Sequence, residues 1–75
     1  MKRIVFATPE ELIQHCENEQ VSLVVEYRDE AGKQRQVVLA EERLPEAKTY
    51  IESPKAEAYY RKDGVFYEVV ASWKP

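Results

Sequence analysis

The chain offers few side chains that could act as nucleophiles or metal ligands, and these do not cluster. His15 and Cys16 are neighbours in a segment expected to be helical, where adjacent side chains point about 100° apart. The sequence holds no second His or Cys that could complete a zinc site. We therefore expect a buried Cys16 and a half-exposed His15, with no metal bound at either.

Carboxylates are numerous but scattered along the chain. A general acid-base pair needs two carboxyl groups held about 5–9 Å apart in a cleft, and a short chain has little room for one. The two glycines, Gly32 and Gly64, both fall in expected turns, so the sequence has no glycine-rich phosphate loop. It therefore predicts a protein that is not an enzyme, with no catalytic residue and no cofactor.

The stretch YYRKDGVFYEVVASW, residues 59–73, combines residue types that bind partners, and it holds five of the eight aromatic residues. Aromatic and basic side chains on a sheet can stack single-stranded bases and hold phosphates. A nucleic-acid site would use Tyr59, Arg61, Lys62 and Phe66. Tyr, Phe, Trp and Arg are also enriched in protein interfaces. A protein-binding site would use Tyr59, Arg61, Phe66 and Val70.

Charge favours the protein-binding hypothesis over the nucleic-acid one. The chain carries 14 acidic and 11 basic residues, for a net charge of -3, whereas duplex-binding proteins usually carry a basic excess. Glu68 is expected to lie opposite Tyr59, where its carboxylate would repel phosphate. We expect a small interaction module of unknown pathway, with binding of single-stranded RNA or DNA as the alternative.

Length and composition limit the kind of protein this is. Seventy-five residues are expected to form a single globular domain, residues 1–75, with a small core and a stability of a few kcal/mol. A single cysteine excludes an internal disulfide and favours a cytoplasmic location. The N-terminal apolar run is too short for a signal peptide or a membrane span, so no membrane association is expected.

The expected elements begin with a strand over 2–7 and a helix over 9–18. Thr8 is a good N-cap, Pro9 suits the first helical position, and Glu11 lies where a capping box requires an acid. The helix has one narrow apolar stripe, formed by Leu12, Ile13 and Cys16. One face of this helix should therefore pack on a sheet while the rest meets water.

The next two β-rich runs, 21–28 and 34–40, predict a hairpin. A three-residue loop with Gly32 in the left-handed position pairs Val25 with Val37 and Leu23 with Leu39, which puts all four on one face. The segment 41–55 follows, and it contains two prolines. Its apolar spacing is compatible with one or two helical turns over 45–52 or with a packed loop.

A second hairpin is predicted at Asp63-Gly64, the dipeptide typical of a type I′ turn. It pairs Tyr60 with Tyr67 and Ala58 with Val69 on the expected core face. The strand that ends before Trp73 is expected at an edge of the sheet.

The resulting fold class is α+β, an antiparallel sheet of about five strands with one helix packed on it. Its order is strand, helix, strand, strand, short helix or loop, strand, strand. A small SH3-like barrel is the alternative, because both hairpins carry apolar residues on both faces. One narrow helix cannot cover both faces, so a second subunit, in a homodimer, is expected to cover the rest.

Overall fold

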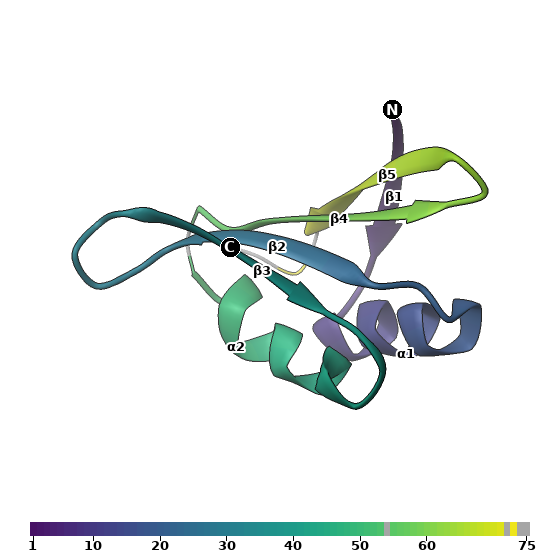
Figure 1. Cartoon of the computed structure of the whole chain (residues 1–75), viewed down its shortest axis with the longest axis horizontal. Helices are drawn as coiled ribbons and strands as arrows, with labels where there is room; N and C mark the ends of the chain where they lie inside the picture. Colours follow the sequence, from purple (N-terminus) through teal and green to yellow (C-terminus); the bar gives the residue numbers. More distant parts are fainter. Residues whose placement is uncertain (54, 72, 74–75) are drawn as a thin grey trace.

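The computed structural model describes residues 1–53, 55–71 and 73 of the chain. The elements are β1 (Lys2–Phe6), α1 (Pro9–Glu19), β2 (Leu23–Arg28), β3 (Gln34–Leu39), the 3-10 helix η1 (Glu41–Glu46), α2 (Ala47–Ile51), β4 (Glu57–Lys62) and β5 (Val65–Ala71). The strands form one sheet, and the helical segments all lie against the same face of it (Figure 1). The expected α+β fold is confirmed.

Helix α1 begins where the Thr8-Pro9 pair predicted. The Thr8 hydroxyl accepts a hydrogen bond from the backbone N–H of Glu11 (3.1 Å), which satisfies one of the free donors of the first turn. The Glu11 carboxylate accepts in return from the N–H of Ala7 (3.1 Å), one residue before the cap. The helix ends at Glu19, and the next residue, Gln20, takes the left-handed conformation (φ 56°) while its N–H donates to the carbonyls of Cys16 and Glu17.

The β2–β3 hairpin has the predicted register. Leu23 lies opposite Leu39, and Val25 lies opposite Val37. Gly32 takes the left-handed conformation with φ +79°, which a side chain rarely tolerates. The turn and the apolar pattern therefore select the same pairing.

The side chain of Asp29 holds this turn together. Its carboxylate accepts from the backbone N–H groups of Ala31 and Lys33, each at 2.9 Å, and from Arg35 Nε at 2.8 Å. The hydrogen bond from the Arg35 guanidinium is the main reason that the pKa of Asp29 lies below its ordinary value, and the backbone donors lower it further. An aspartate at this position thus stabilises both the loop and the start of β3.

The segment between the hairpins forms two short helical pieces rather than an irregular loop. Pro45 lies inside η1, and α2 follows directly. Leu44, Ala47 and Ile51 are buried, while the Tyr50 ring lies 4.8 Å from that of Tyr27 on β2. This segment therefore covers part of the sheet beside α1.

The β4–β5 hairpin closes through the predicted turn. Asp63 and Gly64 both have positive φ (51° and +78°), as a type I′ turn requires. Lys62 lies opposite Val65, and Tyr60 lies opposite Tyr67 with their rings stacked at 4.9 Å. The register again places large apolar side chains on the helix side of the sheet.

The strand order is β1-β5-β4-β2-β3, and it differs from the expectation in two respects. β1 pairs with β5 in parallel, so the sheet is mixed, and β5 is interior rather than at an edge. The crossover from β1 through α1 to β2 makes this possible, because a helical connection can return the chain in the same direction. Since β1 and β3 are the two ends of the order among the described strands, the sheet is open and does not form the alternative barrel.

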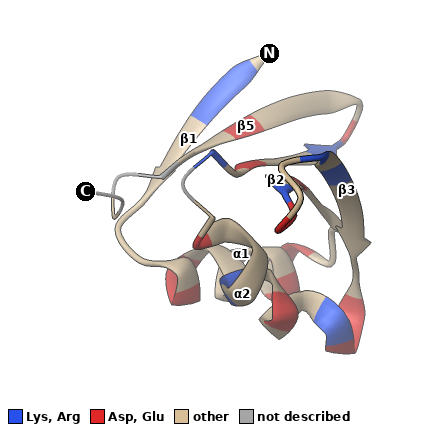
Figure 2. Ribbon diagram, turned by 90° about the vertical axis from the view of Figure 1, so that its left-hand side faces the viewer, with Lys and Arg blue, Asp and Glu red and all other residues tan. Residues whose placement is uncertain are grey.

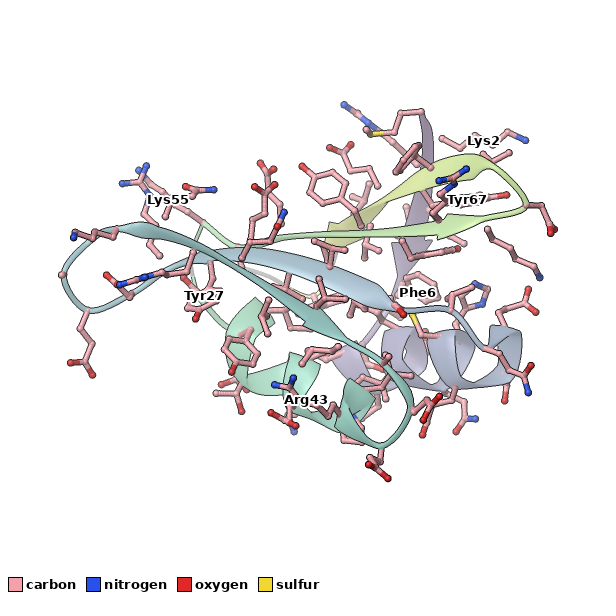
Figure 3. All side chains as sticks on the ribbon, viewed as in Figure 1. Lys2, Phe6, Tyr27, Arg43, Lys55 and Tyr67 are labelled. Carbon is pink, nitrogen blue, oxygen red and sulfur yellow. The ribbon has the colours of Figure 1, made fainter. Side chains whose placement is uncertain are left out.

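The core lies between the sheet and the helices. Its buried residues are Phe6, Leu12, Cys16, Leu23, Val25, Leu39, Leu44, Ala47, Ile51, Ala58, Tyr60 and Val69. Figure 3 shows side chains filling the layer between the sheet and the helices, with the labelled Phe6 reaching from β1 towards α1. In the part of the chain that the structure describes, no helix is both long and apolar enough to cross a membrane.

Candidate functional site

The face of the sheet opposite the helices is covered by none of the described elements, and we call it the open face (Figures 1 and 2). Three large apolar side chains on it are more than half exposed: Val5 (62%), Val38 (54%) and Phe66 (52%). They lie on three different strands, β1, β3 and β5, and exposed apolar groups spread over one uncovered sheet face can mark an interaction site. The open face is therefore the candidate functional site.

One row of cross-strand neighbours crosses the open face from β3 to β1, and we call it the middle row. The pairings that define it run Val38, Val24, Tyr59, Glu68 and Arg3. Its β3 half is apolar, and Val24 and Tyr59 are half-buried. Its β1 half is an ion pair, with Arg3 Nε 2.9 Å from Glu68 Oε1. The row thus joins an apolar strip to a neutralised charge pair.

Carboxylates surround Tyr59 on this face. Its hydroxyl donates a hydrogen bond to the Glu57 carboxylate, and Glu26 lies opposite Glu57 on β2. The bond to Glu57, with smaller effects of burial and of the nearby charges of Glu26 and Glu68, raises the pKa of Tyr59 to about 12. Tyr59 therefore keeps its proton at neutral pH and acts as a donor.

Arg61 and Phe66 form a second feature, near the β4–β5 turn. They are opposite each other in the sheet, and the Arg61 guanidinium carbon lies 5.5 Å from the centre of the Phe66 ring. A guanidinium over a ring is held by a cation–π attraction while its N–H groups stay available. The Phe66 ring thus helps to orient Arg61 on the open face.

The structure brings together the four residues of the predicted protein-binding site. Tyr59, Arg61, Phe66 and Val70 alternate along β4 and β5 and all lie on the open face. Lys62, the fourth residue of the nucleic-acid hypothesis, lies on the other face, where its Nζ is 2.6 Å from Glu19 Oε1 of α1. Three of the four nucleic-acid candidates therefore share a surface.

The sequence analysis missed the contribution of β1 to this surface. Val5 pairs with Val70, and Arg3 pairs with Glu68, so one strand adds an exposed apolar residue and the ion pair. The only sequence signal was the alternation of Arg3 and Val5 against Ile4 and Phe6. That alternation gives no hint of the strand that β1 joins.

Cys16 is buried and His15 is half-buried, as expected. The His15 ring packs between Phe6 and Tyr60 (centroid distances 5.2 and 5.5 Å), and its Nε2 hydrogen-bonds the Tyr60 hydroxyl at 3.0 Å. Cys16 is fully buried, and burial raises the pKa of its thiol to about 11. A protonated, buried thiol is a poor nucleophile.

A cavity of about 620 Å³ lies at the end of α1, away from the open face. Its lining residues are Cys16, Glu17, Gln20, Val21, Ser22, Ala40, Glu41 and Leu44. Among the described residues, no three His, Cys, Asp or Glu side chains are placed to hold a metal ion.

No protein-family model, no curated protein and no solved structure matches this chain.

Proposed function

We propose that this chain is a small, cytoplasmic, non-enzymatic interaction module that binds another protein through its open face. The observation that carries the proposal is the exposure of Val5, Val38 and Phe66 on a sheet face that no described element covers. Leaving such side chains in water costs roughly 25 cal/mol for each Å² of apolar surface, and a bound protein would recover that free energy.

The residue types on the face support a protein partner. Tyr59, Arg61 and Phe66 are of the kinds that supply most of the binding free energy in interfaces. Arg61 is already held over Phe66, so less side-chain entropy is lost when it binds.

Charge on the open face argues against phosphate as the ligand. Besides the Glu68 carboxylate, which is paired with Arg3, two carboxylates, those of Glu26 and Glu57, lie near Tyr59 and would repel a nucleic-acid backbone. Lys62 is engaged with Glu19 on the helix side. Single-stranded nucleic acid is therefore the alternative that the experiment must exclude.

The test is affinity capture from the cells that make the protein, with half of each extract treated with nuclease. The wild type is compared with Phe66→Glu, which places a charge on the open face, and with Ala31→Glu, which adds the same charge at the exposed tip of the β2–β3 hairpin. Because Phe66 is half exposed, Phe66→Glu should keep the fold, which thermal unfolding checks.

We expect the wild type and Ala31→Glu to retain the same proteins from both the nuclease-treated and the untreated extract. Phe66→Glu should lose those proteins. Equal retention by Phe66→Glu would contradict the proposal. Recovery that collapses after nuclease treatment would favour the nucleic-acid alternative instead.

A further inference from the structure

We infer that the partner on the open face is a second copy of this chain, packed face to face about a two-fold axis along the middle row. The inference rests on the proposed function, since it names the protein that the open face binds. Its basis is that, on β4 and β5, residues at equal distances on either side of the middle row are complementary.

The charged residues of β4 match under this rotation. Glu57 and Arg61 each lie two residues from Tyr59, one on either side, and both point to the open face. A two-fold axis through Tyr59, perpendicular to the strand, places Arg61 of each copy over Glu57 of the other. The dimer then gains two equivalent ion pairs, as an isologous interface requires.

The apolar residues of β5 match in the same way. Phe66 and Val70 each lie two residues from Glu68, which belongs to the middle row beside Tyr59. The same rotation places Phe66 of each copy over Val70 of the other. Val24 and Val38 lie on the axis and meet their own counterparts, so apolar groups face apolar groups across the contact.

Glu68 is the residue that this arrangement disfavours, because it also lies on the axis and faces its own copy. Its carboxylate is already paired with Arg3 of the same chain at 2.9 Å. Two neutral pairs therefore meet across the axis instead of two bare carboxylates, which removes most of the repulsion.

The distribution of charge over the whole molecule favours this face over the helix side. The α1 segment has four acidic residues and no Lys or Arg, and residues 41–52 have four acidic and two basic ones. Figure 2 shows these acids on the helices, across the molecule from the open face. Contact through the helices would bring two acidic layers together, whereas contact through the sheets keeps them apart.

The interface would be small. Strands about 4.8 Å apart, each with about 17 Å on the face, outline roughly 400 Å² of sheet, less than the usual 800 Å² per partner. We therefore expect a dimer that dissociates on dilution, and aligned sheets about 10 Å apart.

The test is a charge exchange measured by sedimentation equilibrium on the purified chain. We expect a monomer–dimer equilibrium for the wild type, a dissociation constant about tenfold or more higher for Arg61→Glu and for Glu57→Arg, and recovery in the double variant. Within one chain these two side chains lie four residues apart along a strand, so recovery can come only from contact between copies.

Three results would overturn the inference: a wild-type chain that stays monomeric at about 1 mM, single variants that dimerise as well as the wild type, or a double variant as weak as the singles. Ala31→Glu serves as the control and should match the wild type. If the chain is monomeric while capture still depends on Phe66, the proposed function stands with a different partner. If the chain is monomeric and capture does not depend on Phe66, both the inference and the proposed function fail.

Discussion

Cys16 shows how a single buried side chain sets a chemical property of this protein. Burial in the core raises the pKa of its thiol from 9.0 to about 11. Below pH 9 the thiol is protonated in both the folded and the unfolded chain, so it adds no pH dependence to stability there. Between pH 9 and 11 the unfolded chain ionises first, and stability falls.

We expect the free energy of unfolding to decrease by roughly 2–3 kcal/mol over this range because of Cys16. Chemical denaturation at a series of pH values measures it. The free energy of unfolding of the Cys16→Ala variant should decrease by less over the same range. Its remaining decrease should come from tyrosines such as Tyr60, because burial also raises the pKa of Tyr60. An equal decrease in Cys16→Ala would contradict the assignment.

Thr8 is the residue that starts α1. Replacing it by alanine removes the acceptor of the Glu11 N–H and should cost about 1 kcal/mol of folding free energy. Thr8→Ser keeps the hydroxyl and should cost much less, because serine caps at least as well. Urea denaturation compares the two variants, and an equal loss in both would refute the capping role.

At the scale of elements, the hairpins could be predicted because each carries its own turn chemistry. Gly32 and Asp63-Gly64 fixed the register, and the alternation of apolar residues agreed with it. The partner of β1 could not be predicted, because its parallel pairing with β5 joins residues 65 positions apart that no single turn connects. The contribution of β1 to the open face was missed for the same reason.

The segment 41–52 was ambiguous for a different reason. Pro45 lowers helix propensity locally, yet it is accommodated within η1, and packing of Leu44 and Ile51 stabilises the two short helices. Tertiary contacts, rather than local preference, decide the structure here.

Substitutions of Gly64 measure how much the turn between β4 and β5 contributes to stability. Its φ of +78° is strained for any side chain, although the space around it is open. Gly64→Ala should therefore lower the free energy of unfolding by about 1 kcal/mol. Gly64→Asn should lower it by less, because asparagine tolerates the left-handed region. Thermal unfolding of both variants checks this, and a greater loss for asparagine would contradict it.

At the scale of the whole molecule, the two-layer fold separates neighbouring residues into different roles. Arg61 lies on the open face, whereas Lys62 pairs with Glu19 on the helix side. We expect Arg61→Ala to weaken partner binding about tenfold and Lys62→Ala to leave it unchanged. Since the Lys62 pair is exposed to solvent screening, its loss should change stability only slightly. Binding affinities and melting temperatures of the two variants provide the comparison, and equal effects on binding would contradict the assignment of faces.

The measurement that tests the central claim most directly is photo-crosslinking in cells. A photoreactive amino acid replaces Phe66 on the open face, and a matched control carries it at Glu42, an exposed position on η1. We expect a discrete protein adduct from position 66 that resists nuclease and is absent from position 42. No adduct from position 66, or the same adduct from both positions, would contradict the claim that the open face binds a protein.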